Sequence, residues 1–205
     1  KLIQSRNHAS IGSRTDAAIY VLTSTKNVTE LLEACQVLLS TTAVSVECCV
    51  KFVQTSATQL LLNTIRSCNR STTHQEMLVC ALNSLLNVCR RTELASKVAS
   101  TVESTDILMD IMQMFRDKKQ IFCLSCKLLC RLTACNIQTM KICNTSECRK
   151  RLEGIYHIIE RKHRLEERVA RVGATSSVMT NLLSASVESP MDHIRHLFFI
   201  LDEAK

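Results

Sequence analysis

Glycine, proline and aromatic residues are scarce in this chain of 205 residues. It contains three Gly and one Pro, where ordinary usage at this length would give about 14 Gly and 10 Pro. So few turn-forming residues cannot support many hairpins or sharp corners. Helices joined by short links with Ser, Thr or Asn are the natural alternative. Aromatics make up 3% and apolar residues 46%, so Leu, Ile, Val, Ala, Cys and Met must build the core.

Long apolar runs are also missing, since none approaches the roughly 20 residues that span a membrane. The sequence opens with no signal peptide, and it begins with Lys1 rather than Met, so we interpret it as part of a larger protein. Most of the twelve cysteines lie in apolar helical runs, where a free thiol acts as a small hydrophobe. We therefore expect reduced thiols and a cytosolic or nuclear location. The formal charge of +7 favours acidic partners, without choosing between protein surfaces, nucleic acid and anionic lipid.

Apolar residues recur with helical spacing along nearly the whole chain. The pattern predicts a helix that begins after the capping residue Asn27, and further helices over residues 14–25, 42–54, 56–68, 74–90, 92–100, 105–117, 119–135, 137–144 and 147–171. Two more helical pieces follow, and Ser189 and Pro190 separate them because a residue before proline is pushed out of helix.

Three of these helices carry the same short motif, an apolar residue followed four positions later by a leucine pair. The copies are Ala34 with Leu38–Leu39, Ala81 with Leu85–Leu86, and Leu124 with Leu128–Leu129. Successive pairs lie 47 residues (39 to 86) and 43 residues (86 to 129) apart, within the roughly 40–47 residue period of HEAT and armadillo repeats. The predicted fold is therefore all-α, an armadillo/HEAT-like helical repeat (α-solenoid), with an irregular α-bundle as the alternative. We expect residues 1–172 to form the repeat domain and residues 173–205 a C-terminal helical extension packed on or near the last repeats.

Patterns that carry catalysis are missing. The glycines Gly12, Gly154 and Gly173 form no phosphate-binding loop, and no nucleophile stands with a histidine partner. Cys123 and Cys126 have the spacing of half a zinc site, but they lie inside a leucine-rich helical run where core packing is the simpler interpretation. We predict a protein that is not an enzyme, with no catalytic, metal or cofactor residues.

The helix predicted over 147–171 is the most informative segment. Between Arg149 and Arg171 it holds eight Lys or Arg and four Glu, a local net charge of +4. Its candidate partner-binding basic face consists of Arg149, Lys150, Arg161, Arg164, Arg168 and Arg171. The alternative is a solvated helix laced with i,i+4 pairs such as Glu160 with Arg164 and Glu167 with Arg171.

Apolar residues form a second candidate surface. The apolar stripe of the basic helix changes face along its length, so the helix is expected to run past the repeat stack. The candidate residues for contact with a partner, or for docking within the chain, are Leu165, Val169, Met191, Ile194, Leu197 and Phe198.

Several stretches of the chain also carry a family resemblance: "IRSCNRS" (65–71), "SLLNV" (84–88), "DILMDIMQMFRDK" (106–118), "IYHIIERKHR" (155–164) and, more weakly, residues 190–202. They resemble, in the same order, the C-terminal region of the abnormal spindle family, the microcephaly-associated spindle-pole proteins. "IRSCNRS" and "QMFRDK" are the most specific pieces. The cysteine-rich composition suggests an insect member.

The resemblance implies a large mitotic protein that concentrates at spindle poles, binds microtubules near their minus ends and focuses them. It implies a location in the cytoplasm, at the cytoskeleton and spindle pole, and in the interphase nucleus. In that family calponin-homology domains and calmodulin-binding IQ repeats lie upstream of this region. Neither is present in this sequence, so microtubule and calmodulin binding by the whole protein are not assigned to it.

These observations together predict a non-catalytic protein-interaction scaffold that docks partner proteins in spindle assembly and pole focusing. One alternative is direct binding of acidic tubulin tails by the cationic helix 149–171, and another is a metal or redox module built on Cys123 and Cys126. The expected partners are spindle-pole proteins or microtubules rather than nucleic acid, membranes or small-molecule substrates, and no cofactor is expected.

Overall fold

The computed structural model describes residues 11–173 and 189–203, and within them the chain is helical with no strand. The helices are α1 (Ile11–Ser24), α2 (Val28–Val44), α3 (Val46–Gln54), α4 (Ala57–Arg66), α5 (Thr72–Val88), α6 (Thr92–Ala99), α7 (Ser104–Met114), α8 (Lys119–Cys135), α9 (Ile137–Cys143), α10 (Ser146–Gly173) and α11 (Pro190–Glu203). The all-α prediction is confirmed. The helical piece expected between α10 and α11 lies outside the described residues.

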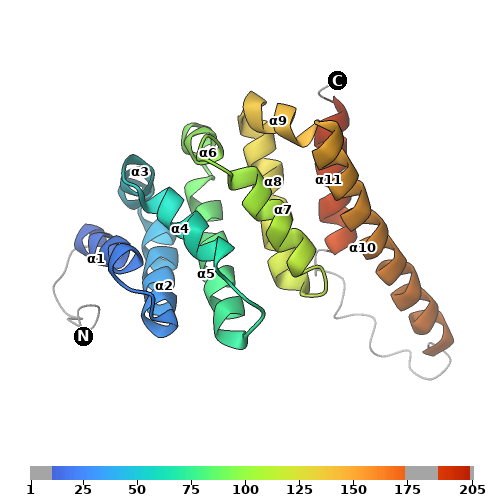
Figure 1. The fold of residues 1–205 in the computed structure, drawn as a ribbon, viewed down its shortest axis with the longest axis horizontal. Coiled ribbons are helices and arrows are strands. Elements are labelled where there is room, and N and C mark those ends of the chain that lie inside the picture. The colour runs from blue at the N-terminus through green and yellow to red at the C-terminus, as the bar shows by residue number, and fades with distance from the viewer. Residues whose placement is uncertain (1–10, 174–188, 204–205) are drawn as a thin grey trace.

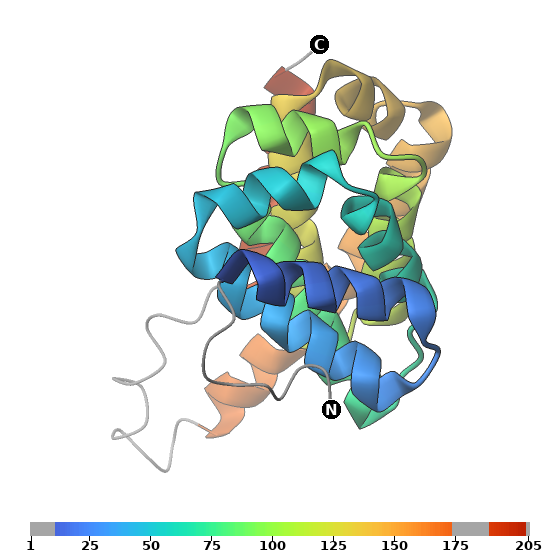
Figure 2. The ribbon, with the colours of Figure 1, turned by 90° about the vertical axis from the view of Figure 1, so that its left-hand side faces the viewer.

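The helices stack as a row of three-helix units (Figure 1). Helices α2, α5, α8 and α11 pack successively against one another, and α1, α4, α7 and α10 form a second row beside them. The short helices α3, α6 and α9 each join one long helix to the next unit. Figure 2 looks along the stack from its N-terminal unit, with the later units behind. Helices α2, α5 and α8 begin at Val28, Thr72 and Lys119, so the period is 44 and then 47 residues (28 to 72, 72 to 119).

The buried positions repeat with the units, and they correct the predicted motif. Ala34 and Ala81 are fully buried, but Leu124 is half-buried, and the fully buried residue of the third unit is its neighbour Ser125. A fully buried leucine follows each small residue four positions later, at Leu38, Leu85 and Leu129. Each of these long helices therefore buries a small residue and, one turn later, a leucine. The third copy is therefore Ser125 to Leu129, one residue later than the sequence motif.

Short polar caps replace glycine at the helix ends. Asn27 Oδ1 accepts hydrogen bonds from the backbone N–H groups of Thr29 (2.9 Å) and Glu30 (3.4 Å), which confirms the predicted cap of α2. Asn136 Oδ1 caps α9 in the same way. Ser45 both ends α2 and caps α3. Single-residue links of this kind let the chain turn between helices without glycine or proline.

Helix α10 begins as the fourth member of its row and then leaves the stack. Its buried residues follow the buried positions of α7 and of its C-terminal cap Phe115, each 44 residues later (104 to 148). The pairs are Ser104 with Cys148, Leu108 with Leu152, Ile111 with Ile155, and Phe115 with Ile159. Helix α7 ends at Met114, so α10 has no counterpart in the row after Ile159. Residues 160–173 extend beyond the stack by about 21 Å at 1.5 Å per residue (Figure 1). We call this segment the overhang.

Candidate interaction site

Helix α11 docks on the stack through the apolar stripe predicted for it. Met191, Ile194 and Leu197 are buried, with 1%, 0% and 0% of their surfaces exposed. They pack where α11 meets α8 and α10. The ring of Phe198 meets that of Tyr156 on α10 edge to face, with centroids 5.7 Å apart. These residues are therefore used within the chain, and docking rather than partner contact is the role their placement favours.

Arg149 joins α10 to α11 instead of facing solvent. Its side chain is 15% exposed and its Nη2 donates to Asp202 Oδ1 at 2.8 Å. Nε and Nη2 also donate to Asn144 Oδ1, and the guanidinium lies 5.8 Å from the centre of the Phe198 ring. Arg151, two residues further along α10, pairs with Asp110 of α7 at 2.5 Å. The first cations of α10 thus hold the last unit together, and we leave Arg149 out of the candidate binding surface.

The overhang carries the remaining basic residues of the predicted face. Arg161, Arg164 and Arg168 are exposed, as is Lys150 in the first half of the helix. The side chain of Arg171 lies outside the described residues. Arg164 donates to Glu160 at 2.9 Å, which confirms one expected i,i+4 pair, while Glu167 contacts His163 at 3.5 Å. Exposed pairs of this kind stabilise a helix by only about 0.3–0.5 kcal/mol, so the cations can exchange these partners for an external anion.

Two apolar residues share the overhang with these cations. Leu165 is 54% exposed and Val169 is 72% exposed. Helix α11 begins beside Ile159 and His163, so its described residues do not extend along the overhang to cover them. The described residues of α11 therefore do not cover Leu165 and Val169. The other C-terminal piece expected to pack on this half of α10 lies outside the described residues.

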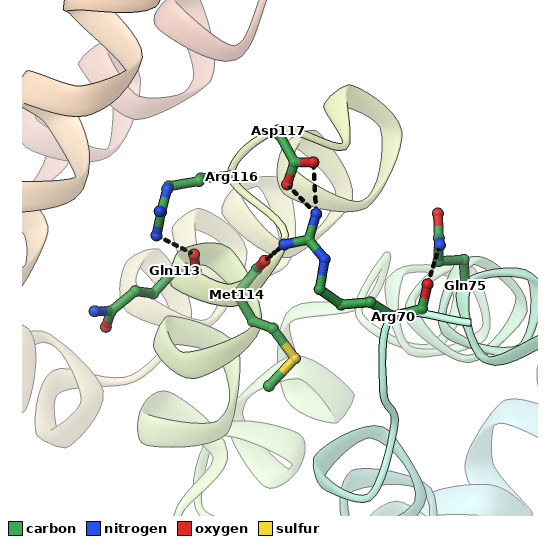
Figure 3. Close-up of polar contacts among 6 residues, drawn as sticks. All are labelled: Arg70, Gln75, Gln113, Met114, Arg116 and Asp117. Carbon is green, nitrogen blue, oxygen red and sulfur yellow. Dashed lines mark hydrogen bonds and ion pairs between the residues drawn. The ribbon is translucent and has the colours of Figure 1, made fainter. Parts of the chain in front are cut away.

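Sequence reasoning missed an ionic contact between the two most family-specific motifs. Arg70, in "IRSCNRS", donates from Nη2 to both carboxylate oxygens of Asp117, in "QMFRDK", at 2.7 and 2.5 Å (Figure 3). Its Nη1 donates to the Met114 carbonyl oxygen at 2.5 Å, and its guanidinium lies 5.8 Å from the centre of the Phe115 ring. The hydrogen bond from Arg70 holds the pKa of the Asp117 carboxyl below its usual range. We call this contact the clamp. The only feature of the sequence that pointed to the clamp is that both motifs, although far apart in the chain, resemble the same family.

The clamp fixes the turn between α7 and α8, which presents three more cations. Arg116, Lys118 and Lys119 are exposed on either side of the clamped Asp117. A cavity of about 210 Å³ opens where this turn, the start of α11 and the overhang meet. The cationic surface therefore extends beyond α10, onto a part of the stack that the sequence did not single out.

The cysteines behave as core residues. No disulfide joins the twelve, all of which lie in the described part of the chain. Cys123 and Cys126 lie within α8, and a hydrogen bond with Cys130 together with burial raises the pKa of the Cys126 thiol well above its usual range. A cysteine must be deprotonated to the thiolate before it can bind a metal ion. Within residues 11–173 and 189–203, no group of three or more His, Cys, Asp or Glu could hold a metal ion. None of the helices in these ranges is long and apolar enough to cross a membrane.

This chain is similar to several proteins named abnormal spindle-like microcephaly-associated protein. The chain is 29% identical over 169 residues, 78% of its length, to the abnormal spindle-like microcephaly-associated protein of Homo sapiens, and equally so to the Bos taurus homologue. It is 28% identical over 186 residues, 85% of its length, to the homologue of Canis lupus familiaris. The chain spans only 5% of the length of each of these relatives. No protein-family model and no solved structure matches the sequence.

Proposed function

We propose that this chain, which resembles proteins named abnormal spindle-like microcephaly-associated protein, is a non-catalytic interaction scaffold within a spindle-associated protein. It docks acidic segments of other proteins during spindle assembly and pole focusing. The relatives are named for the spindle. We extend that association with the spindle to this chain, which we interpret as a part of a much longer protein. Its location would then be the cytoplasm and the cytoskeleton, at the spindle pole, and the nucleus in interphase.

The observation that carries this proposal is the overhang. A stack of buried helices holds one end of α10 rigidly, while Arg161, Arg164 and Arg168 stand clear of the stack on its other end. A cationic helix held away from its own domain can approach an acidic surface without steric interference. Its charges then steer encounter with that surface and select against basic partners.

The scaffold proposal is tested by recovering partners from mitotic extract with the purified chain as bait. The test variant carries Arg161→Glu, Arg164→Glu and Arg168→Glu. A matched control carries the same change of charge at Lys26, Lys97 and Lys141, three exposed lysines outside α10. We expect a defined set of proteins with the unchanged chain and the control, and loss of that set with the test variant. Recovery of the same set by both triple variants would contradict the proposal.

Direct microtubule binding is a second candidate, favoured by the exposed Leu165 and Val169 beside the arginines of the overhang. Such a helix could lie on a microtubule with its cations toward the acidic tails of tubulin. The measurement is co-pelleting of the purified chain with microtubules at low and moderate salt, because contacts with a polyanion weaken steeply with salt. Pelleting that falls with salt, and is lost when the acidic tails are removed by proteolysis, would support it. Absence of pelleting at every salt concentration would refute it.

A further inference from the structure

Both apolar and charged residues line the cavity of about 210 Å³ between the α7–α8 turn, α10 and the start of α11. Ile159 and Met191 form part of its lining, and both are buried in the core, with 4% and 1% of their surfaces exposed. We call this cavity the α10–α11 pocket.

Cations from two separate elements line the pocket. Arg116 and Lys119 come from the α7–α8 turn, and Lys162 comes from the overhang. His163 lies beside Lys162, and the pocket's single lining carboxylate belongs to Glu166. Leaving His163 aside, three positive charges therefore line the cavity with one negative charge, an excess that attracts an anion.

Two of the cations that line this pocket have weak partners in the described structure. Lys162 Nζ forms an ion pair with Glu166 Oε1 at 3.8 Å, which is beyond hydrogen-bond length, and both side chains are more than half exposed. Arg116 uses Nη1 for one hydrogen bond of 3.3 Å to the Gln113 carbonyl oxygen (Figure 3). A guanidinium carries five N–H donors, so most of them remain for a ligand.

The clamp holds part of this site in place before any ligand arrives. Arg70 binds the carboxylate of Asp117 and the carbonyl of Met114, so the backbone between Arg116 and Lys119 is fixed from the neighbouring unit. On the opposite wall, the Ser189 hydroxyl oxygen accepts a hydrogen bond from the Met191 N–H at 3.2 Å and fixes the start of α11. A site whose backbone is ordered in advance loses less conformational entropy on binding.

We propose that the α10–α11 pocket binds the phosphate group of a phosphorylated serine or threonine in a partner protein. A phosphomonoester carries about −1.5 to −2 charges at neutral pH and three strong acceptor oxygens. That charge and those acceptors match three cations that line one cavity better than the single charge of a carboxylate does. A recess between helices suits one modified side chain, whereas a nucleic-acid backbone needs a continuous track of cations.

This inference goes beyond the scaffold proposal. It assigns a second contact, made by Arg116 and Lys119 rather than by the outward arginines of the overhang. Phosphorylation of the partner would then decide whether the contact forms, so binding could follow the mitotic phosphorylation state. The two proposals fail separately, because the triple change at Arg161, Arg164 and Arg168 leaves Arg116 and Lys119 intact.

The test is a titration followed by amide NMR shifts of the isotope-labelled chain. Three peptides with identical Gly-Ala flanks carry phosphoserine, serine or glutamate at the centre. We expect the phosphoserine peptide to cause saturable shifts around residues 116–119 and 159–166, with an affinity at least about tenfold above the other two. Lys119→Gln should weaken binding of the phosphoserine peptide by about tenfold. Lys141→Gln, the same change at an exposed lysine of α9, should leave that binding unchanged. The spectrum itself reports whether each variant is folded.

Three results would overturn the inference. Equal shifts with the phosphoserine and glutamate peptides would mean that the pocket reads only negative charge. Equal binding by the Lys119→Gln and unchanged chains would place the contact elsewhere. Sedimentation with phosphatidic acid vesicles that depends on Lys119, without binding of the phosphoserine peptide, would assign the pocket to a lipid headgroup instead.

Discussion

Replacing Arg70 with alanine removes every contact of the clamp at once. The side chains of Arg70 and Asp117 are each 49% exposed, so solvent screens their ion pair, and such exposed pairs contribute about 0.2–1 kcal/mol. The hydrogen bond to the Met114 carbonyl adds about 0.5–1.5 kcal/mol. The cation over the Phe115 ring adds about 0.5–1 kcal/mol. These terms are not additive, and we expect a loss of about 2 kcal/mol in the free energy of unfolding.

The assay is urea unfolding followed by circular dichroism, with the thermal midpoint as a second reading. For a chain of this length a loss of 2 kcal/mol lowers the melting temperature by roughly 4–8 °C. Arg116→Ala, at a neighbouring exposed arginine with one weak hydrogen bond, is the matched control and should stay within about 0.5 kcal/mol. Arg70→Lys should recover little, because an ammonium cannot form the paired bonds of a guanidinium. Equal stability of the two alanine variants would refute the role assigned to the clamp.

Three further predictions follow from burial and ionisation. Leu85→Ala, at a fully buried site between neighbouring units, should cost about 2–5 kcal/mol in urea unfolding, while Leu165→Ala on the exposed overhang should cost less than about 0.5 kcal/mol. Because the pKa of Asp117 is lowered in the folded chain, its ionised carboxylate stabilises the fold above the ordinary aspartate pKa of 3.8. The difference in unfolding free energy between the unchanged chain and Asp117→Asn, measured by urea titration at several pH values, should therefore shrink as the pH falls below 3.8. Above that pH the difference should grow no further. Burial raises the pKa of the Cys68 and Cys89 thiols to about 12, so a thiol reagent at neutral pH should label them slowly in the native chain and rapidly in urea, and rapid native labelling would contradict their burial.

Most of the fold could be predicted because the spacing of apolar residues along each helix shows which of its faces is buried. The long helix α8 was predicted over its full length, and the helix ends near Asn27 and Pro190 follow from local chemistry. The error at Leu124 shows where the method fails. A motif search favours the leucine over the neighbouring serine as the buried residue, but the structure buries Ser125 fully and leaves Leu124 half-buried.

The site was harder to predict because it depends on residues distant in sequence. A helical wheel places Arg149 on a polar face, but it cannot show that α11 brings Asp202 and Phe198 alongside it. The clamp joins residues 47 positions apart, 70 and 117, whose pairing follows from the stacking of two units. The exposed cations of the overhang could be predicted because none of the residues that the structure describes covers their helix face, so local periodicity was enough to predict their exposure.

The most direct test of the central claim is the salt dependence of binding between the purified chain and a fluorescent glutamate-rich peptide, read by fluorescence anisotropy. The overhang account predicts binding that weakens steeply as salt rises. It also predicts loss of binding with the Arg161, Arg164 and Arg168 charge reversal, and retention with the matched reversal at Lys26, Lys97 and Lys141. Binding that is indifferent to salt, or that survives reversal of the three arginines, would contradict the assignment of the overhang as the acidic-partner surface.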